Sequence, residues 1–325
     1  MFAKLLYVGG RILQMIPVIA LVILVNFSIL KMAPGDLVDV LAGEAGSATP
    51  EFLQSLRQQF GSDQPFLYQL GAYYQKLLTF DLGYSFRNGT DVVSLIADRL
   101  TATILLTGSS LFLAAVTGVF LGWLTANSEH AWLQNTVSVI SSVGFAAPLF
   151  WVGLMLIVLF SVHLQWLPTG GMANLDAEYE GLDYVLDVAK HMIMPVITLS
   201  IYYIAIYARI THAAIDEVQK LDYVRTAHAK GLTKTRVSLQ HVLRNALLPV
   251  VTVTGMQVGS VLSGALVVET VFAWPGMGRL AYDAVIQRDL NLLLGILFFS
   301  SLLVMAANIV TDLLYARLDP RVSLR

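Results

Sequence analysis

Six long apolar stretches constrain the fold of this chain more than any other feature of its sequence. They cover residues 12–31, 100–124, 136–162, 192–212, 247–271 and 291–315. About 20 mostly apolar residues suffice to cross the roughly 30 Å hydrocarbon core of a bilayer as a helix, in which every backbone polar group is satisfied. The sequence therefore predicts an all-α membrane protein with six transmembrane helices.

The composition agrees with this prediction and excludes several kinds of chemistry. Charged residues make up 13% of the chain and hydrophobic residues 56%, whereas soluble proteins carry about 25% charged residues. The chain has no cysteine, which excludes disulfides, thiolate nucleophiles and cysteine-based metal sites. The net charge of −2 gives no reason to expect a polyanionic partner, so only the positions of the charges are informative.

Basic residues are distributed unevenly between the segments that join the apolar stretches. If the N-terminus lies inside, twelve Lys and Arg residues fall in short cytoplasmic segments and three in short outer loops. Because short cytoplasmic segments are enriched in Lys and Arg, both termini are predicted to lie inside. The turn over 125–133 departs from this pattern, since it contains Glu129 and no Lys or Arg.

These features predict four regions along the chain. Residues 1–31 form an N-terminal anchor span, whose apolar run is longer than that of a signal peptide and is followed by no A-x-A site. Residues 32–99 form an extramembrane subdomain with amphipathic pieces at 51–60 and 67–78. Residues 100–315 form a core of five spans with a basic loop at 213–247, and 316–325 form a cytoplasmic tail.

The stretch DYVRTAHAKGLTKTRVSLQHVLRNALLP, residues 222–249, concentrates five Lys or Arg residues and two His. Its periodicity predicts a helix over 213–230, which Gly231 ends in the left-handed conformation. Thr233 is then placed to cap a second helix. The predicted apolar positions are Ala214, Val218, Leu221 and Val224 in the first helix and Leu239, Val242, Leu243 and Ala246 in the second, and the predicted polar positions of the second are Lys234, Gln240, His241 and Arg244.

Three interpretations of this basic hairpin compete. A helix-turn-helix that binds nucleic acid is disfavoured, because membrane spans at both ends hold the loop near the bilayer and no other basic arm supports phosphate contacts. A loop that only sets topology and meets anionic lipid would not need a capped turn. A docking element for a soluble partner explains both the charge and the paired helices.

Residues 222–232 and 241–249 resemble the cytoplasmic EAA loop of binding-protein-dependent ABC importer permeases. The chain as a whole is similar to the B-type permease of the oligopeptide, dipeptide and nickel branch. Further matching motifs follow in the family's order: FGSDQPF at 60–66, DLGYSF at 81–86, WLPTGG at 166–171, VVETVFAWPGMGRL at 267–280 and DLLYARLDPR at 312–321. The Glu-Ala-Ala of the general family is replaced by Arg225, Thr226 and Ala227, as in the peptide branch.

The resemblance implies a type I importer in the bacterial cytoplasmic (inner) membrane. Its expected partners are a C-type permease, two ABC ATPase subunits and a solute-binding protein outside. The sequence contains no G-x-x-x-x-G-K-[ST], so ATP and Mg²⁺ are expected on the ATPase subunits, with no cofactor, metal or catalytic residue on this chain. Di- or oligopeptides are the expected solute, with a nickel chelate, an opine or a sugar as alternatives.

The resemblance also implies which residues act in coupling and transport. The expected coupling residues are Arg225, Thr226, Ala227, Gly231, Thr233, Lys234 and Arg244, and the expected residues of the translocation path are Thr254, Gln257, Ser260, Ser263 and Glu269. Helix packing is an alternative role for the fifth span, since Gly255 and Gly259 form a G-x-x-x-G pair. Glu269 could instead be a solvated helix end, and Pro148 predicts a kink in the third span.

Two other classes of membrane protein fit less well. An ion-coupled secondary transporter predicts ionisable residues near the middle of the membrane and an inverted repeat, whereas Arg209, Glu269 and Asp312 lie near span ends. An intramembrane hydrolase needs a recognisable catalytic constellation, and Ser109, Ser110 and His191 match no such motif.

Overall fold

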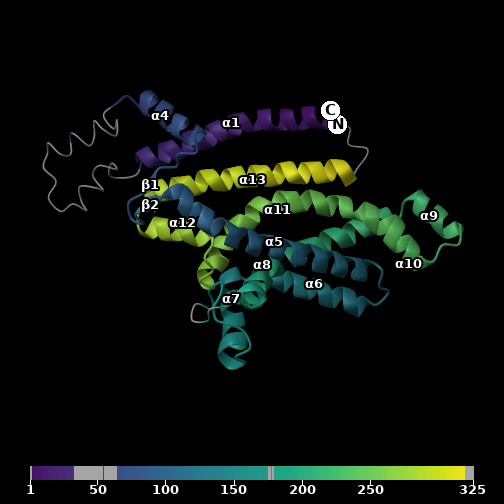
Figure 1. Ribbon diagram of the computed structural model, residues 1–325. Helices are drawn as coiled ribbons and strands as arrows, with labels where there is room; N and C mark the ends of the chain where they lie inside the picture. The colour runs from purple at the N-terminus through teal and green to yellow at the C-terminus, as the bar shows by residue number, and fades with distance from the viewer. Residues whose placement is uncertain (1, 33–53, 55–63, 175–176, 178, 319–325) are drawn as a thin grey trace. The chain divides into compact units, whose positions relative to one another are not determined.

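The computed structural model describes residues 2–32, 54, 64–174, 177 and 179–318, drawn as coloured ribbon in Figure 1. Side chains at 2–12, 14–15, 30, 258, 260–264 and 312–318 lie outside this description. The chain divides into two compact units, Met1–Ala97 with Asp283–Leu303, and Asp98–Tyr282 with Val304–Arg325.

Helices make up almost all of the described secondary structure. The α-helices are α1 (Phe2–Met32), α4 (Phe66–Leu78), α5 (Val92–Ala126), α6 (Ala131–Ala146), α7 (Leu149–Leu156), α8 (Gly181–Val218), α9 (Asp222–Ala229), α10 (Lys234–Arg236), α11 (Arg244–Val271), α12 (Met277–Ile286) and α13 (Leu290–Leu318). Two π-helices, η1 (Ile157–His163) and η2 (Val237–Leu243), continue α7 and precede α11, and β1 (Tyr84–Ser85) pairs with β2 (Thr90–Asp91) in an antiparallel hairpin.

In the first unit, α4 and the β-hairpin pack against apolar helices. The ring of Phe27 in α1 lies 5.2 Å from that of Phe66 and 5.5 Å from that of Tyr73, both in α4. The hydroxyl of Ser85 in β1 donates a hydrogen bond of 2.5 Å to Asp289, which precedes α13. The amphipathic piece predicted at 67–78 is thus confirmed as α4, whereas the piece predicted at 51–60 lies almost entirely outside the described residues.

In the second unit, α8 is the central helix and packs against α6, α7 and α11. Its buried residues, including Leu199, Tyr203 and Tyr207, form a core with Leu106 of α5. Pro195, which has no backbone N–H to donate, lies inside α8 without ending the helix. The apolar core thus runs along α8, and the α9–α10 region lies at one end of the unit (Figure 1).

Within the described residues, three helices are long and apolar enough to cross a membrane, and a bent pair can supply a fourth span. The three are Val92–Ala126, Gly181–Val218 and Leu290–Thr311, and α1 contains a shorter apolar stretch over Ile16–Ile29. Each falls on a predicted apolar stretch. Helix α5 begins inside the segment assigned to the subdomain 32–99, earlier than the predicted span.

The third predicted span departs most from expectation. Helix α6 and the α7–η1 pair meet at an angle of 105°, so the break is far sharper than a kink within a continuous helix. Ala147 and Pro148 both adopt extended backbone, with ψ of 130°. The residue before a proline is sterically pushed out of the helical region, and proline itself donates no backbone hydrogen bond, so two consecutive residues leave the helix.

Candidate functional site

The basic hairpin consists of two short helices, but the first is separate from the long helix before it. Helix α8 ends at Val218, and Gln219 to Leu221 form a turn before α9 begins at Asp222. The predicted unbroken helix over 213–230 is therefore wrong. Leu221, predicted on the apolar face, is the extended N-cap residue of α9 and is 45% exposed.

The turn between α9 and α10 has the predicted chemistry. Gly231 adopts a φ of +79°, the left-handed region that glycine enters without steric cost. Its N–H donates to the carbonyl of His228, which satisfies one of the free carbonyl groups at the end of α9. The side chain of Thr233 accepts a hydrogen bond of 3.4 Å from the N–H of Arg236, so the predicted N-cap is confirmed.

The second helix of the hairpin continues beyond the predicted loop 213–247. Helices α10, η2 and α11 follow one another without a break from Lys234 to Val271. A π-helix accommodates extra residues per turn and shifts every later side chain around the axis. Val237 and Val242 are buried in consequence, while Leu239, predicted on the apolar face, is 46% exposed.

An apolar core joins the hairpin to the ends of α5 and α8. Its buried members are Ala214, Ile215, Val224, Ala227, Val237, Val242 and Ala246. Ala227 is thus a packing residue of the hairpin and does not face solvent. Because this core holds α9 against η2, the hairpin is a fixed part of the second unit.

The remaining coupling residues lie on the outside of the hairpin. Arg225 is 74% exposed and lies 3.6 Å from Asp222 of the same helix. Lys234 is 91% exposed and lies 3.8 Å from Glu129, the single acid of the turn between α5 and α6. Such exposed pairs contribute about 0–1 kcal/mol each, so these charges remain available to a partner surface.

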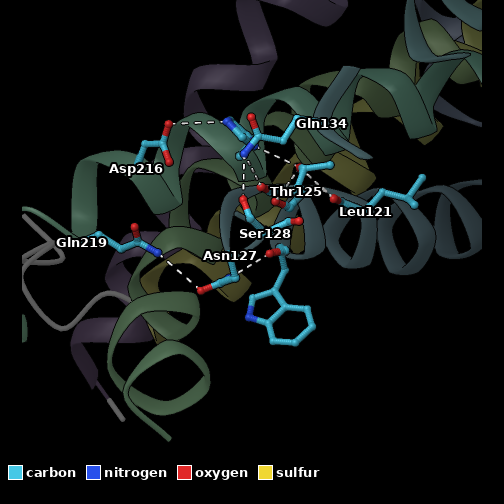
Figure 2. A network of polar contacts seen from close by, with 10 residues as sticks. Leu121, Thr125, Asn127, Ser128, Gln134, Asp216 and Gln219 are labelled. Atoms are coloured by element: carbon cyan, nitrogen blue, oxygen red, sulfur yellow. Dashed lines mark hydrogen bonds and ion pairs between the residues drawn. The ribbon is translucent and has the colours of Figure 1, made fainter. Parts of the chain in front are cut away.

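A polar network connects the same turn to the hairpin (Figure 2). The Oδ1 atom of Asn127 accepts hydrogen bonds from Gln219, at 3.5 Å, and from the hydroxyl of Ser238, at 2.9 Å. The indole of Trp123 donates to the same hydroxyl of Ser238 at 2.9 Å. Figure 2 shows the contact between Asn127 and Gln219. Asn127 therefore joins the end of α5 to the turn before α9 and, through Ser238, to η2.

A second set of contacts fixes the turn itself. The hydroxyl of Thr125 lies 3.0 Å from Nδ1 of His212 in α8. The amide of Gln134 in α6 donates to the backbone carbonyl of Ser128 at 2.9 Å. Both contacts hold the turn against neighbouring helices (Figure 2).

Sequence reasoning missed this network almost completely. Trp123 and Asn127 lie close together at the end of α5, but their partners Gln219 and Ser238 are about 90 to 115 residues away in the chain, and only folding brings them together. One signal was present: Glu129 was the exceptional acid in a turn predicted to be basic, and the structure places it beside Lys234.

Among the predicted path residues whose side chains the structure describes, Thr254 and Glu269 lie far apart on α11. Thr254 bonds to its own helix, at 2.8 Å from the carbonyl of Val250, and Gln257 is partly exposed. The side chains of Ser260 and Ser263 lie outside the described residues. Glu269 lies about 22 Å along α11 from Thr254, at 1.5 Å per residue.

Glu269 is fully buried, so its interpretation as a solvated helix end is wrong. One carboxylate oxygen accepts from the hydroxyl of Thr103 in α5 at 2.8 Å, and the other from the N–H of Arg279 in α12 at 3.0 Å. The indole of Trp274, also fully buried, donates to the carbonyl of Ala102 at 2.9 Å. These contacts join the far end of α11 to α5 and to the first turn of α12.

Two family models match the chain in succession. Residues 118–324 match the binding-protein-dependent transport system inner membrane component, and residues 4–107 match the N-terminal region of such membrane components.

Individual relatives match over nearly the whole length. The oligopeptide transport system permease protein AppB of Bacillus subtilis is 36% identical, with 97% of this chain and 98% of the relative covered. The glutathione transport system permease protein GsiC of Escherichia coli is 37% identical, with 97% and 98% covered. A solved chain of the MetNI methionine ABC transporter matches with a TM-score of 0.56 at 17% identity, over 70% of this chain and 97% of that one, and supports the fold alone.

Proposed function

This chain belongs to the family of binding-protein-dependent transport system inner membrane components, and we propose on that premise that it forms the translocation path of an ATP-driven importer for di- or oligopeptides. It is a permease subunit of an ABC transporter in the inner membrane. Its proposed task is to couple the movement of separate ATPase subunits to the passage of a solute.

One observation carries the coupling role. The hairpin exposes charged side chains on α9 and α10, while its other face is buried in an apolar core. Its second helix continues directly into α11, which packs along α8 and α7. A force applied to α10 therefore has a continuous helical route into the membrane part of the second unit, and α9 acts on that route through its packing against η2.

We assign the coupling role to Arg225, Thr226, Ala227, Gly231, Thr233, Lys234 and Arg244 by their place in this hairpin. The exposed basic side chains suit acidic or carbonyl groups of an ATPase surface. Gly231 and Thr233 shape the turn, and Ala227 packs beneath α9. For the path we propose Thr254, Gln257, Ser260 and Ser263, the polar side chains of α11. For Glu269 we propose a structural role, which is to join α11 to α5 and α12, because both of its carboxylate oxygens accept hydrogen bonds from these helices.

The proposed topology has six spans with both termini inside. It rests on the apolar stretches and on the excess of basic residues in the short inner segments. The proposed regions are the anchor 1–31, the periplasmic subdomain 32–99, the core 100–315 with its coupling loop 213–247, and the tail 316–325.

The proposed assembly contains a C-type permease, two ABC ATPase subunits that bind ATP and Mg²⁺, and an external solute-binding protein. The sequence of this chain encodes no phosphate-binding loop, which supports hydrolysis on other chains. Peptide is the proposed solute, because relatives over the whole chain carry oligopeptide and glutathione transport in their names. A nickel chelate, an opine or a sugar is the alternative.

Reconstitution tests this function directly. The complex that co-purifies with this chain is placed in proteoliposomes with ATP inside or outside, and uptake of a labelled peptide mixture is measured with the co-purified binding protein present. Uptake that requires ATP and the binding protein is expected. Uptake driven by an ion gradient without ATP would exclude the importer, and a non-peptide ligand recovered with the binding protein would exclude the proposed solute.

A further inference from the structure

The contact between α9 and η2 is the place where the hairpin joins the helix that enters the membrane part. Apolar side chains form most of this contact, with Val224 and Ala227 of the α9 side packed near Val237 and Val242. Hydrophobic contact is non-directional and scales with buried area. Such packing holds two helices together but does not by itself fix how far one can slide along the other.

Three hydrogen bonds beside this packing do have a direction. The hydroxyl of Tyr223 in α9 donates to the backbone carbonyl of His241 in η2 at 3.2 Å. The side-chain amide of Asn245, in the first turn of α11, donates to the hydroxyl of Tyr223 at 2.7 Å and to the same carbonyl at 3.1 Å. We call Tyr223, Asn245 and the carbonyl of His241 the tyrosine clamp.

The tyrosine clamp lies at an unusual point of the backbone. His241 belongs to the π-helical turn, and Asn245 belongs to the α-helix that follows it. A π-helical turn within a longer helix often marks a functional site, because its bonding pattern differs from that of the neighbouring turns. Side chains that bond to a carbonyl in this turn favour one arrangement of the junction over others.

The same π-helical turn is held from a second side. Ser238, near its start, accepts from Trp123 and donates to Asn127, both at the end of α5. The junction is therefore bonded to α9 through Tyr223 and to α5 through Ser238. A displacement of α9 relative to α5 must change the position of η2 or break one of these two sets of bonds.

We propose that the tyrosine clamp is the positioning element that passes movement of α9 to α11. This inference rests on the proposed function, since it specifies how the coupling hairpin acts on the membrane helices. Tyr223 and Asn245 need not contact the ATPase to do so. Their role is to fix the register of α9 against the π-helical turn.

The test compares ATP use with uptake in the reconstituted complex. Tyr223→Phe removes one oxygen atom and retains the ring, and Asn245→Ala removes the other donor. Each is expected to lower the solute transported per ATP hydrolysed by about fivefold, the scale of effect when one or two net hydrogen bonds cease to favour a conformation. ATPase subunits are expected to co-purify in normal amounts, and the double variant is expected to be no worse than either single one, because the groups act as a unit.

Tyr184→Phe serves as the matched control, since it removes the same atom from an exposed tyrosine on α8. It is expected to leave uptake per ATP unchanged. Variants that couple like the wild type, or that lose the ATPase subunits, would overturn the clamp as a positioning element. A wild-type complex without ATP-driven uptake would overturn both the proposed function and the clamp. Variants that couple normally in an active complex would overturn the clamp alone.

Discussion

Gly231 has the backbone conformation that most strictly limits the choice of side chain in the hairpin. Its φ is +79°, and no atom lies within 4 Å of the position that a Cβ would occupy. The cost of a substitution there is therefore one of backbone conformation, not of space. A left-handed conformation costs an ordinary residue about 1–2 kcal/mol, and a β-branched residue tolerates it least.

We expect Gly231→Val to reduce ATP-driven uptake about tenfold while the chain still inserts in the membrane. The physical reason is that valine disfavours the turn that places α9 against η2. Uptake and ATP hydrolysis by the reconstituted complex measure the effect. Gly231→Asn is the control, because asparagine enters the left-handed region more readily, and equal activity of all three proteins would reduce the loop to a topology signal.

Glu269 illustrates a residue whose role depends on distant parts of the chain. The sequence places it near the end of an apolar span, but the partners of its carboxylate come from α5 and from the backbone of α12. Gly276 lies directly against this carboxylate, so a Cβ at that position would collide with it. Glycine is needed there because of a close approach that only the folded chain creates.

We expect Glu269→Ala to destabilise the protein by about 2–4 kcal/mol, since it leaves buried donors without an acceptor. Glu269→Gln keeps one acceptor oxygen and should cost less. Thermal unfolding in detergent measures both. Glu129→Gln is the control at an exposed position, 89% exposed at its side chain, and an unaltered melting temperature for Glu269→Ala would show that the buried contacts contribute little.

Helices α5 and α8 approach each other at two glycines of α5 that are four residues apart. A Cβ at Gly118 would lie 2.5 Å from Cβ of Tyr207, and one at Gly122 would lie 2.5 Å from the carbonyl oxygen of Ala208. Small residues at this spacing let two membrane helices pack closely. The sequence predicts this role for the G-x-x-x-G pair Gly255 and Gly259. In the structure, Gly255 lies tightly against Thr311, whereas Gly259 is only in ordinary contact with Val304.

We expect Gly122→Val to push α5 away from α8 and to destabilise the protein by about 1–3 kcal/mol or more, as overpacking does. The neighbouring backbone of α8 cannot rotate away as a flexible side chain could. Gly108→Ala on the same helix is the control, because no atom lies within 4 Å of its Cβ position. Melting temperatures of the two variants decide, and equal values would contradict the close packing.

Local sequence signals predicted the hairpin well and its helical register poorly. Gly231 and Thr233 act through their immediate neighbours, so their roles could be predicted from spacing. The exposure of Leu239 could not, because a helix of 3.6 residues per turn was assumed where the chain forms a π-helix. The break before α9 was missed because the apolar positions on both sides of it share the same spacing.

The sequence also predicted where the membrane helices lie but not how they are oriented. Apolar length places the helices, and the structure has a helix on every predicted stretch. Hydropathy does not report direction, so it did not reveal that α6 and α7–η1 meet at 105°. A pair bent in this way either crosses the membrane as a broken span or returns to the side from which it entered.

Single cysteines resolve this alternative, because the natural sequence contains none and each introduced thiol is unique. Glu129→Cys lies before α6 and Thr169→Cys follows η1, and both positions are exposed. If the pair crosses the membrane, as six spans require, we expect a membrane-impermeant maleimide to label Thr169→Cys in spheroplasts. Glu129→Cys should then be labelled only after the inner membrane is opened.

Positions on either side of α8 test the same alternative. With both termini inside, Glu180→Cys should be labelled from outside, and Lys230→Cys in the hairpin only from inside. A re-entrant pair would place Thr169 on the same side as Glu129 and would reverse α8. The hairpin and the turn that carries Glu129 would then lie on opposite sides of the membrane, which their contact at 3.8 Å between Lys234 and Glu129 forbids. That contact, together with the length of α8, therefore favours a broken span that crosses the membrane.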